Sequence, residues 1–89
     1  MESPQSRLGR LRSRSMWRGL REMDLILRDF SHRHLATLSD PDLDLYEALL
    51  EEPDPDLLAW ITGAAPPPAR HAAMVARIRA GAVGVAKAP

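Results

Sequence analysis

Apolar residues recur along this chain at the three- and four-residue spacing of one helix face, and no segment alternates apolar and polar residues as a half-buried strand does. The most regular pattern covers residues 20–37. Its apolar stripe consists of Leu20, Met23, Ile26, Leu27, Phe30 and His34. On the polar face, Asp24 with Arg28 and Asp29 with Arg33 have the i, i+4 spacing of favourable ion pairs. This stretch predicts the best-defined helix of the chain.

A shorter helix is predicted before it, over residues 5–17. Its stripe is narrower and consists of Leu8, Leu11 and Ser15. Gly19 stands between the two patterns and predicts a turn, because glycine adopts positive φ without steric cost.

Two more short helices are predicted in the middle of the chain. Ser39 as N-cap and Pro41 in the first turn start a third helix, which ends at about residue 51. Its apolar residues are Leu43, Tyr46, Leu49 and Leu50. Asp54 as N-cap and Pro55 as first residue then start a fourth helix, which Gly63 ends. Its apolar residues are Leu57, Leu58, Trp60 and Ile61.

A fifth helix is predicted over residues 69–80, with Gly81 as its stop. Its expected inner face consists of Ala73, Met74, the aliphatic stem of Arg77 and Ile78. We therefore predict an all-α fold, a compact bundle of five short helices. Residues 1–80 form a single domain, and residues 81–89 form a disordered C-terminal tail.

Charge changes this picture, because a net charge of zero over 89 residues hides a sharp division. Six arginines lie between residues 7 and 21 with no acid among them, and eight acids lie between residues 40 and 56 with no base. Such a division either holds two parts of a fold together or presents two faces to partners.

Metal and catalytic chemistry have little support. Cysteine is absent, so thiolate sites and disulfides are excluded. His32 and His34 are two residues apart and point in different directions on a helix, and His71 is isolated, so we expect surface or interface histidines. No nucleophile motif or phosphate-binding glycine loop occurs. We expect no enzyme and no bound metal.

The acids at 40, 42, 44 and 51 match four ligand positions of a calcium-binding loop. Leu45, however, occupies the position where that loop needs glycine for its sharp turn. The apolar pattern of the same stretch also requires a helix. We therefore interpret these acids as a capped helix start and a solvated face.

The arginine-rich stretch allows two further interpretations. A basic first helix suits binding of nucleic acid or of another protein, which is the alternative function that we keep. Residues 1–16, rich in Arg and Ser, also have the composition of a mitochondrial presequence. No run of eighteen apolar residues occurs, so no membrane span is expected.

The segment Arg18-Gly19-Leu20-Arg21-Glu22 joins the basic stretch to the strongest helix. Its charges at a helix start are candidates for recognition of another surface. A purely structural role is also open: Gly19 makes the turn, Glu22 caps the helix by reaching back to the Gly19 N–H, and Arg18 pairs with the acidic half.

The same segment resembles a known family signature. The run W-R-G-L-R-E-M-D of residues 17–24 is similar to the R-G-x-x-E motif of the succinate dehydrogenase assembly factors, the bacterial SdhE type and its mitochondrial counterparts. Arg18, Gly19 and Glu22 fall on its fixed positions. Residues 38–40, 49–51 and 54–57 with Trp60 resemble the L-S-D, L-L-E and D-P-D-L-x-x-W segments of that family. The resemblance covers residues 16–63.

This resemblance implies a monomeric five-helix protein that binds the flavoprotein subunit of succinate dehydrogenase, with fumarate reductase as a second client. It would promote covalent attachment of FAD to a histidine of that subunit. FAD would be the cofactor of the client, and the factor would bind none itself. The implied location is the bacterial cytoplasm, with the mitochondrial matrix as the alternative.

The resemblance also implies a partner-binding site. We expect Gly19 to let the client backbone approach closely, and Arg18, Arg21 and Glu22 to make charge-assisted hydrogen bonds to the client. Asp24 and Trp17 would extend the contact, although Trp17 suits the core equally well.

Overall fold

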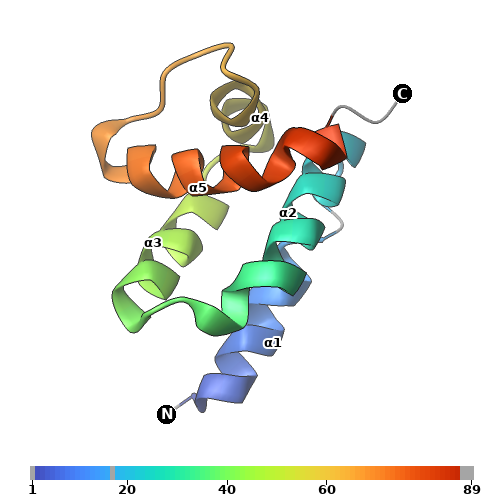
Figure 1. The fold of residues 1–89 in the computed structure, drawn as a ribbon. Helices are drawn as coiled ribbons and strands as arrows, with labels where there is room; N and C mark the ends of the chain where they lie inside the picture. Colours follow the sequence, from blue (N-terminus) through green and yellow to red (C-terminus); the bar gives the residue numbers. More distant parts are fainter. Residues whose placement is uncertain (1, 17, 87–89) are drawn as a thin grey trace.

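The structure is a computed structural model that describes residues 2–16 and 18–86, with side chains as far as residue 82. Its five α-helices are α1 (Pro4–Arg14), α2 (Arg21–His34), α3 (Asp40–Leu50), α4 (Asp54–Thr62) and α5 (Ala69–Ala86) (Figure 1). A short 3-10 helix, η1 (Leu35–Thr37), follows α2 directly. No strand occurs in the described part of the chain. The predicted all-α, five-helix fold is confirmed.

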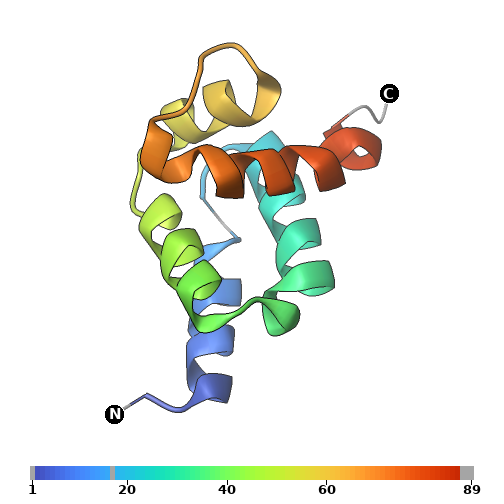
Figure 2. The ribbon, with the colours of Figure 1, turned by 60° about the vertical axis from the view of Figure 1, so that its left-hand side comes forward.

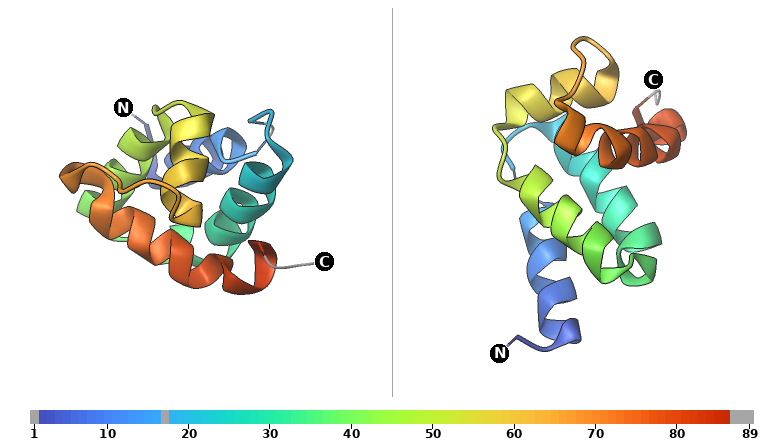
Figure 3. Two further views of the ribbon diagram at one scale, coloured as in Figure 1. Left: turned by 90° about the horizontal axis from the view of Figure 1, so that it is seen from above. Right: turned by 90° about the vertical axis from the view of Figure 1, so that its left-hand side faces the viewer.

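The last helix organises the packing. α5 runs across α2 and α3 (Figure 2), and it also packs against α4. Seen from above, α5 lies along one side of the molecule, and α1 lies on the opposite side (Figure 3). The α1–α2 loop therefore lies away from the α5 layer.

The predicted apolar stripes form one core. The buried apolar residues from α2 and α3 are Met23, Ile26, Leu27, Phe30, Leu43, Tyr46, Leu49 and Leu50. Phe30 stacks on Tyr46 with ring centroids 5.5 Å apart. Tyr46 also bonds to Ser15, whose hydroxyl oxygen lies 2.6 Å from the phenol oxygen. Since Ser15 donates its own proton to the Leu11 carbonyl, Tyr46 is the donor of that bond. Ser15 and Tyr46 thus join α1 to α3.

Of the boundary residues predicted for the third and fourth helices, Ser39 and Gly63 are confirmed and Asp54 is wrong. The Ser39 hydroxyl accepts the Asp42 N–H at 3.3 Å at the start of α3, and Gly63 ends α4 with φ +85°. The N-cap of α4, however, is Pro53 and not Asp54. Asp54 is already helical, and its carboxylate contacts Arg18.

The first helix ends at Arg14, three residues before the predicted end, and Ser15 is its C-cap. The last turn predicted for the second helix is η1 and not α-helix. Of the two ion pairs predicted on α2, Asp29 and Arg33 form theirs at 2.9 Å. Asp24 and Arg28 form none, because the Asp24 carboxylate reaches back to the preceding loop.

The predicted end of the fifth helix is wrong, because α5 continues through Gly81 to Ala86. Ala82 is buried, so packing beyond Gly81 offsets the low helix propensity of glycine. The tail expected over 81–89 therefore begins as helix, and residues 87–89 lie outside the described part.

The inner face of α5 also differs from the expectation. The buried residues are His71, Met74, Val75, Ile78 and Ala82, whereas Ala73 and Arg77 are exposed. His71 was expected at the surface, but only 2% of it is exposed. Its ring lies 5.7 Å from that of Trp60, and its Nε2 lies 2.7 Å from Glu52. This carboxylate partner allows a polar ring to be buried. The contact with His71, followed by that with Arg70, lowers the pKa of Glu52.

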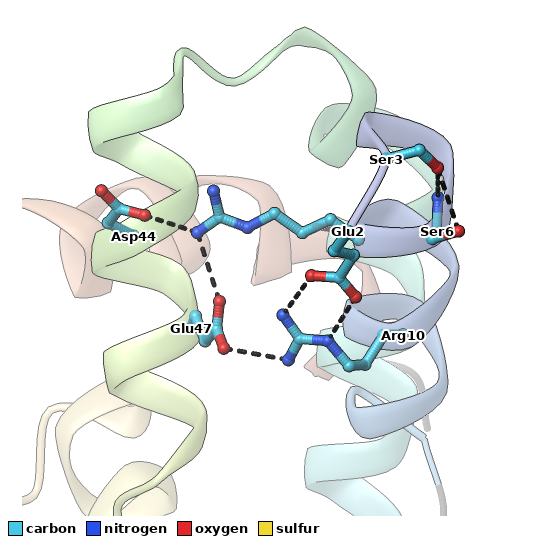
Figure 4. A network of polar contacts seen from close by, with 7 residues as sticks. Glu2, Ser3, Ser6, Arg10, Asp44 and Glu47 are labelled. Carbon is cyan, nitrogen blue, oxygen red and sulfur yellow. Dashed lines mark hydrogen bonds and ion pairs between the residues drawn. The ribbon is translucent and has the colours of Figure 1, made fainter.

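The division of charge joins α1 to α3. Arg7 bonds to Asp44 and, at 3.2 Å, to Glu47. Arg10 lies between Glu2 and Glu47, at 2.8 and 2.9 Å (Figure 4). The hydrogen bond from Arg10 holds the pKa of Glu47 below its usual range. Much of the arginine charge is thus balanced within the fold.

Candidate partner-binding site

The R-G-x-x-E segment forms the loop between α1 and α2 and the first turn of α2. Gly19 has φ +96°, a conformation that residues with a side chain rarely adopt. It is exposed, and a Cβ built on it meets no described atom within 4 Å. Backbone conformation and not crowding therefore requires glycine here, and no described residue fills the space in front of Gly19.

Arg18 turns into the protein. Its Nε donates to Asp54 at 2.7 Å, and its terminal nitrogens donate to the carbonyl oxygens of Arg14 at 3.1 Å and Leu50 at 2.9 Å. Only 13% of the side chain is exposed. The guanidinium therefore ties the loop to the end of α3 and the start of α4. This geometry agrees with the structural role considered for Arg18, that of pairing with the acidic half.

Asp24 fixes the other end of the loop. Its Oδ1 accepts the backbone N–H of Arg18 at 2.6 Å. The N-cap of α2 is Leu20, and no side chain caps this helix. The cap expected from Glu22 to Gly19 is therefore wrong. Instead, the Asp24 carboxylate accepts the N–H of Arg18, the residue before Gly19, and so orders the loop.

Arg21 and Glu22 lie in the first turn of α2, separated from Gly19 by the N-cap Leu20, and both are exposed. Neither forms a hydrogen bond through its side chain, or an ion pair, with another described residue. A carboxylate in the first turn suits the positive end of the helix. The two charges are thus available beside the open face of Gly19.

Two more residues extend this surface, and neither was predicted from the sequence as a site residue. Leu25 is 45% exposed, and Arg28 is exposed one turn further along α2. Met16, Arg21, Asp24, Leu25 and Arg28 line a shallow pocket. A signal was present, since Leu25 is an apolar residue outside the buried stripe of α2. Trp17, the remaining predicted site residue, lies outside the described residues.

Within the described residues, no three His, Cys, Asp or Glu side chains gather as a metal site would require. Nor does any helix there have the length and apolar character to cross a membrane. The acids once compared with a calcium loop lie in and next to α3, where Asp42 and Asp44 pair with arginines.

The arginine run offers little free charge for nucleic acid. Arg7, Arg10, Arg14 and Arg18 each form an ion pair with an acid of the same chain. Phosphate contacts need unpaired cations on one surface. The geometry therefore gives the nucleic-acid alternative no specific support.

Comparison with known proteins gives consistent matches. A family model described as "Flavinator of succinate dehydrogenase" matches residues 9–82. A relative from Meyerozyma guilliermondii, called succinate dehydrogenase assembly factor 2, mitochondrial, is 44% identical over 61 residues, 68% of this chain and 45% of its own length. A protein of the same name from Mycosarcoma maydis is 39% identical over 71 residues, 80% of this chain and 30% of its own.

A bacterial relative also matches. The FAD assembly factor SdhE of Vibrio cholerae is 39% identical over 46 residues, 52% of this chain and 54% of its own length. The chain thus spans less than half the length of the two fungal relatives and about half that of this bacterial one.

Proposed function

This chain belongs to the succinate dehydrogenase flavinator family, and from that premise we propose that it binds the flavoprotein subunit of succinate dehydrogenase and promotes covalent attachment of FAD to it. FAD is the cofactor of the client, and this chain contributes no catalytic group. The flavoprotein subunit of fumarate reductase is a second client of the same kind.

The observation that carries the proposal is the exposed surface of Gly19, Arg21 and Glu22. Gly19 is exposed and has no side chain, so its backbone is accessible, and the two charges beside it have no internal partner among the described residues. A client segment can therefore approach the Gly19 backbone while its polar groups bond to Arg21 and Glu22. Bonds to ionised groups are the stronger kind and favour one orientation.

Binding of this kind promotes a reaction of the client by ordering it. Joining a client histidine to the flavin requires the two groups to be held in reactive geometry, and fixed geometry lowers the barrier of a joining reaction. Arg18 and Asp24 serve this function indirectly, because they hold the loop that presents Gly19. Trp17 is included in the proposed contact from its place in the motif.

The chain is proposed to act as a monomer, in the bacterial cytoplasm or, for a mitochondrial protein, in the matrix. Its relatives include proteins named mitochondrial and a bacterial factor. Fractionation of the source cells, and sedimentation of the purified protein, test these two statements.

The experiment that tests the function is reconstitution. The apo flavoprotein subunit is incubated with FAD, with and without this protein, and covalent flavin is read as fluorescence of the subunit in a denaturing gel. We expect the fluorescence to rise with the amount of added protein. As a positive control, the same client preparation is shown to acquire covalent flavin when a known family member is added. Equal fluorescence with and without this protein then contradicts the proposal. The fumarate reductase subunit is tested in parallel.

A further inference from the structure

Leu25 is a large apolar side chain exposed beside the motif. It is 45% exposed, and the other exposed large apolar residue among those described is Leu45 on α3, at 36%. Single exposed leucines are common and carry no message by themselves. Leu25, however, lines the pocket with Met16, so two apolar side chains meet there.

Charge surrounds this apolar patch in a defined order. Arg21, Leu25 and Arg28 are spaced i, i+4 and i+7, so they lie along one face of α2 with the leucine between the two arginines. Neither arginine forms an ion pair with a described residue, in contrast to Arg7, Arg10, Arg14 and Arg18.

The acids near this face form no ion pair with either arginine. Asp24 lines the pocket, but its Oδ1 accepts the Arg18 N–H at 2.6 Å. Asp29, the next acid along α2, pairs with Arg33 at 2.9 Å. Glu22 is exposed at the Gly19 end of the helix. The pocket therefore has Leu25 between two arginines without an ion-pair partner among the described residues, and the Asp24 carboxylate beside them bonds to the Arg18 N–H.

We propose that this face of α2, the pocket of Met16, Arg21, Asp24, Leu25 and Arg28, is a second contact for the client. It takes an apolar side chain of the flavoprotein subunit, and carboxylates flanking that side chain pair with Arg21 and Arg28. The inference rests on the function proposed above and extends its surface, because Arg21 belongs to both. An apolar anchor with charges at its rim is a common arrangement at protein interfaces.

Leu25→Glu and Leu45→Glu form a matched pair for the test, because each places a carboxylate at an exposed helical position and only the first lies in the pocket with Arg21 and Arg28. Affinity for the apo flavoprotein subunit is measured by isothermal titration calorimetry, with circular dichroism melting of each variant. We expect Leu25→Glu to raise Kd by about tenfold or more, and Leu45→Glu to change it by less than about twofold.

Charge is tested separately. Arg28→Gln removes one proposed pairing cation and keeps most of the side-chain volume, so we expect weaker binding that depends less on salt than wild-type binding does. Arg79→Gln on α5 is the control. It removes one arginine charge in the same way, but Arg79 lies next to Gly63 and is not one of the pocket residues. An Arg28→Gln variant with unchanged affinity and unchanged salt dependence overturns the charge part of the proposal.

The remaining outcomes separate the two proposals. If Leu25→Glu binds as wild type does while Glu22→Ala binds weakly, the second contact is wrong and the proposed function stands. If wild-type protein shows no binding to the subunit, the proposed function is wrong and this inference fails with it. If Leu25→Glu abolishes a dimer that sedimentation detects in the wild type, a second copy of the chain occupies the face and the proposal is overturned.

Discussion

The guanidinium of Arg18 donates from Nε to Oδ1 of Asp54 at 2.7 Å, so the first residue of the motif faces the start of α4 and not solvent. Asp24 holds the backbone N–H of the same arginine at 2.6 Å. A single residue thus ties the loop to α2, α3 and α4. The fixed positions of the signature divide into one that supports the loop, Arg18, and two that face outwards, Gly19 and Glu22.

Arg18→Met is therefore expected to destabilise the fold. The substitution leaves the Asp54 carboxylate and the Leu50 carbonyl without their donor, and we expect the free energy of unfolding to fall by about 1–3 kcal/mol. A double-mutant cycle with Asp54→Leu, followed by urea denaturation, measures the coupling. Additive effects of the two substitutions would show that the pair is not a coupled interaction.

Gly19→Ala and Gly19→Arg separate strain from contact. Both impose about the same cost of positive φ, about 1–2 kcal/mol, and neither Cβ meets a described atom. We expect similar melting temperatures for the two, but much weaker flavinylation with arginine, whose side chain would stand in the contact.

Gly63→Ala is the control for these variants. Gly63 also has positive φ, and its added Cβ would lie 3.0 Å from Arg79, so this variant loses stability at a site remote from the motif. Below its melting temperature, we expect it to support flavinylation. Equal activity of Gly19→Arg and Gly63→Ala would argue against a contact at Gly19.

The α1–α3 network predicts a dependence on pH. The hydrogen bond from Arg10 lowers the pKa of Glu47 in the folded state below the ordinary value of 4.5. The ionised Glu47 carboxylate therefore stabilises the fold at pH values above its unfolded-state pKa of 4.5. This stabilisation is lost as the pH falls through the lower pKa of the folded state. Because the pair is partly exposed, we expect at most about 1 kcal/mol.

Glu47→Gln tests this directly. Its unfolding free energy should be lower than that of the wild type at neutral pH, and the two curves should converge as the solution becomes acidic. High salt should reduce the difference. Curves that stay parallel down to low pH would show that the Glu47 carboxylate adds no such stability.

Much of the fold could be predicted from the sequence, because local signals and packing agree. The 3.6-residue stripes of α2 and α3 bury the residues expected except Leu20 and His34, which are half-buried, and Ser39 and Gly63 mark ends that single residues determine. Gly81 failed as a stop signal, because α5 continues past it and Ala82, the next residue, is buried. His71 was misassigned because its burial depends on Glu52, which lies nineteen residues earlier.

The candidate site was predictable only in part. The motif indicated Gly19, and its positive φ agrees with the predicted turn. The inward direction of the Arg18 side chain depends on where α4 begins in space, which the order of residues does not reveal. Leu25 was not predicted as a site residue, because the apolar stripe of α2 indicates only which face of the helix is buried.

The most direct test of the central proposal compares two carboxylates. Glu22 and Asp56 are both exposed acids in the first turn of a helix, so Glu22→Gln and Asp56→Asn should cost similar, small amounts of stability. Covalent flavin on the succinate dehydrogenase flavoprotein subunit is measured by in-gel fluorescence with the wild type, each variant and no factor. We predict that Glu22→Gln lowers the fluorescence towards the level without factor, while Asp56→Asn matches the wild type. Wild-type fluorescence with Glu22→Gln would contradict a role for this carboxylate in flavin attachment.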